Sequence, residues 1–219
     1  MANQRENILI VATQLFYEQG YDNTYFYQIA DHLNITKPLI SYYFKSKSHL
    51  AQEVSERYTL SNKNNIALRL YQDYFNHQKY DLQLSTAIEI RLQDTLTYTD
   101  SKVKSFVQES ANGNFEDIYF SNYKSFFKIH DRQYGLNINH DNDEISLLAR
   151  GFFAASMAIR LGFLNQELNC SMEECLDYTI ELLFRFMRID ENRIAEIINA
   201  SKSIIAALNF EFKPYFIIN

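Results

Sequence analysis

The hydroxyl and ammonium side chains near the N-terminus are the residues of this 219-residue sequence best placed to do chemistry together. Residues 32–52 contain Lys37, Lys45 and Lys47 but no Asp or Glu, so this window carries a charge of +3 in a chain of net charge -6. Ammonium and hydroxyl groups donate hydrogen bonds to phosphates and to base edges. Such a run is usually only a solvated face, but its placement on a predicted helix with exposed hydroxyl groups favours a surface that contacts DNA.

Residue chemistry suggests a role for each member of this surface. Thr36 opens a predicted helix, so its hydroxyl and the first N–H groups of that helix can face a phosphate. Lys37 is the best candidate for a contact with a guanine edge, and Ser41 is the next. Packing inside a small domain is the alternative role for Tyr42 and Tyr43.

Three helices are predicted to position these side chains. Apolar residues recur at helical spacing over residues 8–16, and Gly20 ends that helix. A short second helix follows with Thr24 as its N-cap, and a third begins at Thr36. Asn34 lies in the turn between them, where a left-handed backbone is needed and Asn is tolerated. This layout is typical of a helix-turn-helix DNA reader.

The same stretch resembles a known family. The similarity runs from Ile8 to Leu50 and looks like the DNA-binding domain of the TetR family of bacterial transcriptional regulators. It implies an all-helical homodimer in which the second and third helices bind the operator and the remainder holds an effector pocket and the dimer interface. The matching segments are Ala12-Thr-Gln-Leu15-Phe16, Gly20-Tyr21-Asp-Asn-Thr24, Gln28-Ile29-Ala30, Ile35-Thr36-Lys37 and Tyr42-Tyr43-Phe44-Lys45-Ser46-Lys47-Ser-His-Leu50.

The resemblance completes the predicted DNA-binding set. Tyr42, Tyr43 and Lys47 match family positions that hold the DNA backbone, while Thr24 and Tyr25 begin the second helix and would meet the neighbouring phosphates. The sequence departs from the common family pattern at four positions, namely Asn34, Pro38, Ser41 and Tyr43. The full predicted set is Thr24, Tyr25, Thr36, Lys37, Ser41, Tyr42, Tyr43 and Lys47.

The rest of the chain is predicted to be helical because only five Gly and two Pro interrupt it. The predicted fold class is all-α, with a three-helix helix-turn-helix DNA-binding domain over residues 1–47. A larger helical domain for ligand binding and dimerisation follows over residues 48–219. We expect helices from Ser46 to about residue 77 and near 81–98, 101–112, 115–133, 143–165, 171–188 and 190–209, then an extended tail from Phe210.

A ridge of small residues in the helix at 143–165 marks the predicted dimer interface. Glycine inside a helix costs about 1 kcal/mol relative to alanine, so close helix packing is expected there. Packing within one subunit is the alternative. The predicted interface comprises Gly151, Ala154, Ala155, Ala158, Gly162, Leu182 and Phe186.

Aromatic residues in the middle of the chain predict an apolar effector pocket, although any single one is more often a core residue. Arg91, Arg150 and Arg160 lie on helices that could meet there, and one that points inward would favour an anionic ligand. The predicted lining is Arg91, Tyr98, Phe106, Tyr119, Tyr123, Phe127 and Phe152.

Together these features predict a homodimeric repressor that a small, largely apolar or aromatic effector releases from double-stranded operator DNA. The alternatives are a helical protein-interaction scaffold and a DNA-binding activator without an effector. No enzyme motif, metal site or cofactor is predicted, and Cys170 and Cys175 are interpreted as structural thiols.

The polar N-terminus lacks the apolar stretch of a signal peptide, and the weakly polar run Gly151–Leu164 is short, so a cytoplasmic protein without membrane contact is expected. The acidic net charge does not exclude DNA. Residues 1–50 hold four basic and four acidic residues, so the whole excess of acid lies in residues 51–219.

Overall fold

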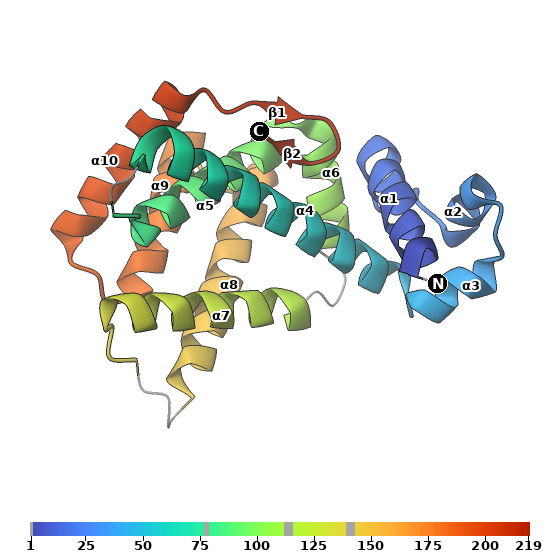
Figure 1. Cartoon of the computed structure of the whole chain (residues 1–219), viewed down its shortest axis with the longest axis horizontal. Coiled ribbons are helices and arrows are strands. Elements are labelled where there is room, and N and C mark those ends of the chain that lie inside the picture. Colours follow the sequence, from blue (N-terminus) through green and yellow to red (C-terminus); the bar gives the residue numbers. More distant parts are fainter. Residues whose placement is uncertain (1, 77–78, 112–115, 139–142) are drawn as a thin grey trace.

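The helices of the chain divide between a small N-terminal group and a larger body (Figure 1). The computed structural model describes residues 2–76, 79–111, 116–138 and 143–219. Over these residues the fold is all-α apart from a short C-terminal hairpin, as predicted. The α-helices are α1 Ala2–Gln19, α2 Phe26–Leu33, α3 Lys37–Tyr43, α4 Lys47–Arg69, α5 Leu82–Thr99, α6 Ser101–Ser110, α7 Glu116–Tyr134, α8 Glu144–Leu164, α9 Met172–Phe186 and α10 Glu191–Leu208. The remaining elements are a π-helical turn η1 (Leu70–Phe75) that continues α4, and the strands β1 (Phe212–Lys213) and β2 (Ile217–Ile218).

The first three helices pack around one small apolar core. Phe16 of α1, Ile29 of α2 and Ile40 of α3 are fully buried in it. Gly20 has a φ of +83° and Asn34 has a φ of 51°, so both turns use the left-handed backbone that the sequence predicted.

The start of α2 differs from the prediction. Tyr25, not Thr24, is the N-cap, and its N–H donates to Gln28 Oε1 at 2.7 Å. Thr24 is fully buried, and its hydroxyl donates to the Gly20 carbonyl at 2.7 Å. The hydroxyl therefore stabilises the turn after α1 from inside and does not cap the next helix.

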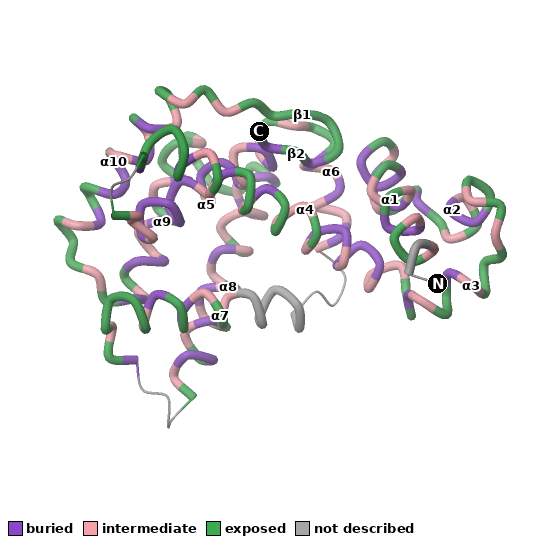
Figure 2. Tube along the Cα trace, in the orientation of Figure 1, coloured by how far each residue is buried: buried purple, intermediate pink, exposed green. Residues whose placement is uncertain are grey.

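A single long helix joins the two parts of the molecule. α4 begins beside α3 and runs across the body, where it packs against α5 (Figure 1). In the body, α5 packs against α9 and α10, α8 packs against α7 and α9, and α6 contacts both α1 and α8. The buried residues form one continuous cluster that extends from α1 to the C-terminal hairpin (Figure 2).

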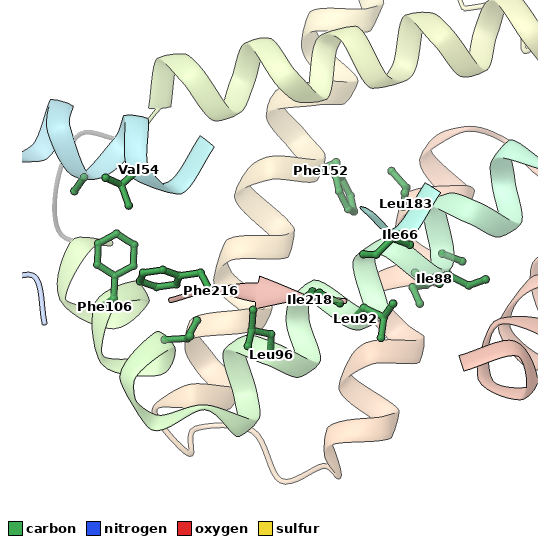
Figure 3. Close-up of a cluster of buried hydrophobic side chains, with 14 of the residues drawn as sticks. Val54, Ile66, Ile88, Leu92, Leu96, Phe106, Phe152, Leu183, Phe216 and Ile218 are labelled. Atoms are coloured by element: carbon green, nitrogen blue, oxygen red, sulfur yellow. The ribbon is translucent and has the colours of Figure 1, made fainter. Parts of the chain in front are cut away.

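The C-terminal tail is extended, as predicted, and folds back as a hairpin in which Phe212 faces Ile218 and Lys213 faces Ile217. Phe216 and Ile218 are fully buried. Figure 3 shows Phe216 beside Phe106 of α6, within the apolar core of the body. The hairpin is thus an integral part of the core and not a loose end.

α8 is the one helix of the described residues that is long and apolar enough to cross a membrane by length and composition alone, with a mean hydropathy of 1.5. It begins at Glu144, close to the predicted start at residue 143, so the helix is longer than the weakly polar run Gly151–Leu164. Arg160 of this helix is paired with Asp94 of α5, and α8 packs against α7 and α9. Its apolar side chains are therefore those of a helix in the body of the protein.

Candidate nucleic-acid interface and ligand cavity

The polar side chains of α3 project from the small N-terminal group of helices. Thr36 is its N-cap with an extended backbone (φ -91°, ψ 145°), and Lys37 and Ser41 are exposed. Tyr42 is 78% exposed, which excludes the packing role considered for it. Tyr43 is partly buried and contacts the core, so packing holds for this residue at least in part.

Lys47, at the start of α4, ties that helix to the turn between α1 and α2. Its ammonium donates to the carbonyls of Tyr21 at 2.9 Å and Asp22 at 3.3 Å. It also lies over the rings of Tyr21 (4.3 Å) and Tyr25 (5.1 Å). Two of its three N–H groups are therefore used within the described residues.

The turn between α2 and α3 is fixed by backbone hydrogen bonds. The Ile35 N–H donates to the Ala30 carbonyl at 3.0 Å, and the Asn34 N–H donates to the Asp31 carbonyl at 3.3 Å. These bonds end α2 and set the direction in which α3 leaves. The two bonds thereby fix the orientation of α3 relative to α2.

The body holds the N-terminal helices at a second point, through Glu109 of α6. This carboxylate accepts from the Asp22 N–H at 2.7 Å and lies against Gly20. In the last turn of α1, the Tyr17 hydroxyl donates to Asp100 at 2.8 Å. Burial together with this bond raises the Tyr17 pKa to about 12. A movement of α6 would therefore be transmitted to α1 and to the turn before α2.

A cavity of about 490 Å³ lies in the body, among α4 to α8. Its volume is within the range of small-molecule sites. Most of its wall is apolar or aromatic, and Phe106, Phe126 and Phe152 are prominent in it. α4 contributes several of its residues between Gln52 and Lys63, so the helix that leaves α3 also forms a wall of the cavity.

Asp94 and Arg160 form the charged end of this cavity. Arg160 donates to Asp94 Oδ1 from Nε at 3.0 Å and from Nη2 at 2.6 Å. Asp94 Oδ2 is buried and has no hydrogen-bond partner among the described residues. A buried acceptor left unpaired costs about 1–3 kcal/mol, and more when it is charged.

The phenols in the cavity wall are neutral. Burial raises the pKa of both Tyr58 and Tyr123. Burial also raises the pKa of Glu89, while Lys63 at 3.7 Å lowers it. The wall therefore offers hydroxyl groups, a carboxylate paired with a lysine and the Asp94–Arg160 pair.

Comparison with known proteins gives a match in the region that contains α3. Residues 8–54 match the family model described as bacterial regulatory proteins, tetR family. The N-terminal part of the chain is thus similar to this family.

Solved structures resemble the fold over about nine-tenths of the chain. The structure of RolR without ligand has a TM-score of 0.56 and 15% identity, and the likeness covers 89% of this chain and 96% of RolR. RolR in complex with its ligand resorcinol has a TM-score of 0.61 and 18% identity, over 90% of this chain and 96% of RolR. At these identities the likeness establishes the fold alone. No curated protein sequence matches the chain.

Three of the residues predicted to line the pocket, Phe106, Tyr123 and Phe152, do line the cavity. Phe127 lies in the core and not in the cavity wall. The hydroxyl of Tyr98 instead approaches Cys175 Sγ at 3.6 Å. The side chain of Tyr119 lies outside the described residues.

Arg91 lies outside the cavity wall as well. It is 4% exposed, and its guanidinium pairs with Glu173 at 2.9 Å and with Asp177, which joins α5 to α9. Arg160 is the arginine that reaches the cavity, but Asp94 already neutralises it. This pair could not be predicted from local patterns, because the two residues are 66 positions apart on different helices.

Some small residues of α8 pack within the subunit, and others are exposed to solvent. A Cβ at Gly151 would lie 2.9 Å from Phe186 Cε1, and one at Gly162 would lie 3.3 Å from Leu168 Cγ, so both glycines permit close packing within the subunit. Ala154 and Ala158 are exposed. The other predicted interface residues, Ala155, Leu182 and Phe186, are partly buried.

Proposed function

We propose that this protein is a homodimeric repressor of the TetR family whose affinity for operator DNA is lowered by a small effector bound in the cavity. The observation that carries the proposal is the double role of α4. This helix begins at Lys47, beside the proposed DNA surface, and its residues Gln52, Ser55 and Tyr58 line the cavity. An effector that prefers one position of α4 therefore changes the population of DNA-binding conformations.

The proposed DNA surface consists of exposed and partly buried side chains around α3. Lys37 and Ser41 contact base edges, whereas Thr36, Tyr42 and Tyr43 contact phosphates together with Tyr25 and Lys47. Thr24 has a supporting role from inside the turn, because it is buried.

The proposed homodimer forms through α8 and α9. α8 has high mean hydropathy, yet only 28% of the residues in its most apolar window are buried. Leu147 on α8 is 67% exposed and Tyr178 on α9 is 53% exposed. A second copy of the same face would remove this apolar surface from water and give an interface with two-fold symmetry. Two α3 helices would then read two half-sites about one DNA turn apart.

A binding titration tests the proposal. Purified protein is titrated into fluorescent duplexes from its own upstream DNA, and anisotropy is measured at about 50 and 200 mM salt. We expect specific binding that weakens steeply with salt, because lysines displace counterions from phosphates. Lys37→Ala should reduce affinity about tenfold and relax discrimination at one position of each half-site. Lys128→Ala, an exposed lysine on α7, is the matched control and should bind like the wild type.

Salt-independent binding, or equal losses for Lys37→Ala and Lys128→Ala, would contradict the proposed surface. The repressor role has its own readout. Deletion of the gene should raise transcription from the bound promoter, and a fall in transcription would identify an activator instead. We propose a cytoplasmic location, since both partners of such a regulator are found there.

A further inference from the structure

The unpaired oxygen of Asp94 indicates which chemical group the cavity accepts. Asp94 is 2% exposed and lines the cavity, and both N–H groups that it receives from Arg160 go to Oδ1. Oδ2 has no partner within the described part of the chain. A carboxylate oxygen only accepts hydrogen bonds, so the group that satisfies it must be a donor.

The charges around Asp94 disfavour an anionic ligand. Arg160 already directs two N–H groups to Asp94 and a third to Met157 Sδ at 3.3 Å. Glu89 and Glu56 also line the cavity, where Lys63 is the only other cation among the described lining residues. A second carboxylate placed beside Asp94 would be repelled and would leave Oδ2 unpaired. The expectation that an inward arginine favours an anion therefore does not apply to this pair.

A cationic donor is disfavoured by the same geometry. The guanidinium of Arg160 is within 3.0 Å of Asp94 Oδ1, so an ammonium group at Oδ2 would lie close to a like charge. An uncharged hydroxyl donates without this repulsion. Phe106, Phe126 and Phe152 in the wall provide faces and edges on which an aromatic ring packs well.

We infer that the effector is an uncharged aromatic compound with at least one hydroxyl group, which donates a hydrogen bond to Asp94 Oδ2 while its ring lies among the phenylalanines. The inference rests on the proposed function, since it takes the cavity to be the effector site. Asp94 is then the residue that determines specificity, and Arg160 is the positioning residue that holds its other oxygen.

Three probes with the same ring system test the inference. 1-Naphthol carries the donor, naphthalene lacks it, and 1-naphthoate replaces it with an anion. Calorimetric titration of the full-length protein should give at least tenfold tighter binding for 1-naphthol than for either of the others. Equal or tighter binding of naphthalene or 1-naphthoate, or no binding of 1-naphthol, would overturn the inference.

Variants assign the preference to Asp94. Asp94→Asn should reduce the preference for 1-naphthol over naphthalene at least fivefold, whereas Glu89→Gln, the matched change at another carboxylate of the cavity, should keep it. Preserved preference in Asp94→Asn would refute the role of Asp94. If this variant does not fold, the three probes on the wild type still decide the chemistry. DNA affinity measured with saturating 1-naphthol separates the proposed function from the ligand chemistry. If 1-naphthol binds the protein tightly but leaves the DNA affinity unchanged, the effector role is contradicted and the chemistry of the cavity is not.

A second, independent observation concerns the C-terminal hairpin. The ring of Phe216 stacks on Tyr58 of α4 with centroids 4.6 Å apart, and it meets Phe106 of α6 at 5.2 Å and Tyr17 of α1 at 5.3 Å. Tyr58 and Phe106 both line the cavity. Figure 3 shows Phe216 next to Phe106. One side chain therefore contacts two walls of the cavity and a helix of the DNA-binding domain.

The hairpin is fixed firmly at both sides of this ring. Asn62 of α4 donates to the Phe216 carbonyl at 2.8 Å and accepts from the Ile218 N–H at 3.0 Å. The Tyr215 hydroxyl donates to Glu18 of α1 at 2.9 Å. Tyr215 and Phe216 have φ values of 64° and 65°, a conformation that non-glycine residues adopt only when their surroundings impose it.

We propose that the hairpin is a clasp that transmits the state of the cavity to α1. A ligand that displaces Tyr58 or Phe106 also displaces Phe216, and α1 moves with it through Tyr17 and Tyr215. This path does not run through the start of α4 at Lys47, because the hairpin contacts α1 directly.

The clasp is tested with Phe216→Leu, which keeps an apolar side chain but removes the three ring contacts. Phe212→Leu, on the same hairpin but 40% exposed, is the control. Phe216→Leu should change the affinity for upstream DNA at least fivefold and speed hydrogen exchange in α1, while Phe212→Leu should change affinity less than twofold. Unchanged DNA affinity in Phe216→Leu, or faster exchange confined to the hairpin, would overturn the proposal.

Discussion

His130 on α7 is buried in its neutral form. Nδ1 donates to the Phe126 carbonyl at 3.0 Å, and Nε2 accepts from the Thr86 hydroxyl at 3.3 Å. Burial lowers its pKa to about 4, and Lys63 nearby acts in the same direction. In the unfolded chain the pKa of histidine is about 6.5. At a pH below that value, the imidazole is protonated in the unfolded state but remains neutral in the folded state.

The free energy of unfolding should therefore fall as the pH decreases from about 6.5 to 4, by up to about 3 kcal/mol from this residue. Urea denaturation at a series of pH values measures the effect. His130→Gln should make the free energy of unfolding less dependent on pH in this range. His32 is an exposed histidine on α2, and His32→Gln should leave the pH dependence as in the wild type. A His130→Gln profile with the wild-type slope would show that other groups cause the loss.

Gly20 is required for two separate reasons. Its φ of +83° favours glycine, and a Cβ would lie 2.7 Å from Glu109 Oε2. Gly135 has a φ of +62°, but a Cβ added there would have nothing within 4 Å. Gly135→Ala should thus cost only the backbone strain of about 1–2 kcal/mol. Gly20→Ala should cost about 1 kcal/mol more, because Glu109 must move from the Asp22 N–H. Chemical denaturation compares the two, and equal losses would mean that Glu109 adjusts freely.

At the scale of helices, most boundaries could be predicted because their signals are local. Ser171 and Glu174 form a capping box at the start of α9, close to the predicted start of that helix, and the Glu174 N–H donates to Ser171 Oγ at 3.2 Å. The π-helical end of α4 and the N-cap at Tyr25 were not predicted, since both depend on packing against other elements. The hairpin partner strands were missed for the same reason: their pairing is stabilised by Asn62, about 150 residues away.

The two candidate sites also differ in how far local sequence signals could predict them. The residues of α3 are contiguous, so their types and spacing suffice to predict a surface. The cavity is formed by several helices, and its charged end joins Asp94 to Arg160 over 66 positions. Aromatic content pointed to Phe106, Tyr123 and Phe152, but nothing in one helix distinguishes a residue of the cavity wall from one of the core, such as Phe127.

The turn between α2 and α3 depends on the left-handed backbone of Asn34. Asn34 has a φ of 51° and a ψ of 48°, the left-handed conformation that glycine adopts without a Cβ penalty. Asn34→Ala should lower the free energy of unfolding by about 1 kcal/mol, and Asn34→Gly should be nearly neutral. Thermal or urea denaturation distinguishes them. If both variants lose the same stability, the Asn34 side chain contributes more than its tolerance of this backbone.

The dimer is the feature that belongs to the whole molecule, and the exposed face of α8 provides its test. Ala158 is exposed in the single chain, so Ala158→Glu should leave the fold intact while placing a carboxylate in the proposed apolar interface. Analytical ultracentrifugation at micromolar concentration should then show a dimer for the wild type and a monomer for the variant. Ala195→Glu, an exposed alanine on α10, is the matched control and should remain dimeric.

DNA binding should follow the oligomeric state. A monomer contacts one half-site at a time, so it loses the advantage of binding the second half-site within the same complex. We expect Ala158→Glu to bind upstream DNA at least tenfold more weakly than the wild type, although its α3 surface is unchanged. Adding a second α3 by fusing two Ala158→Glu chains through a long flexible linker should restore part of this loss. A monomeric variant with wild-type affinity would mean that one α3 is enough, and that the apolar face of α8 has another purpose.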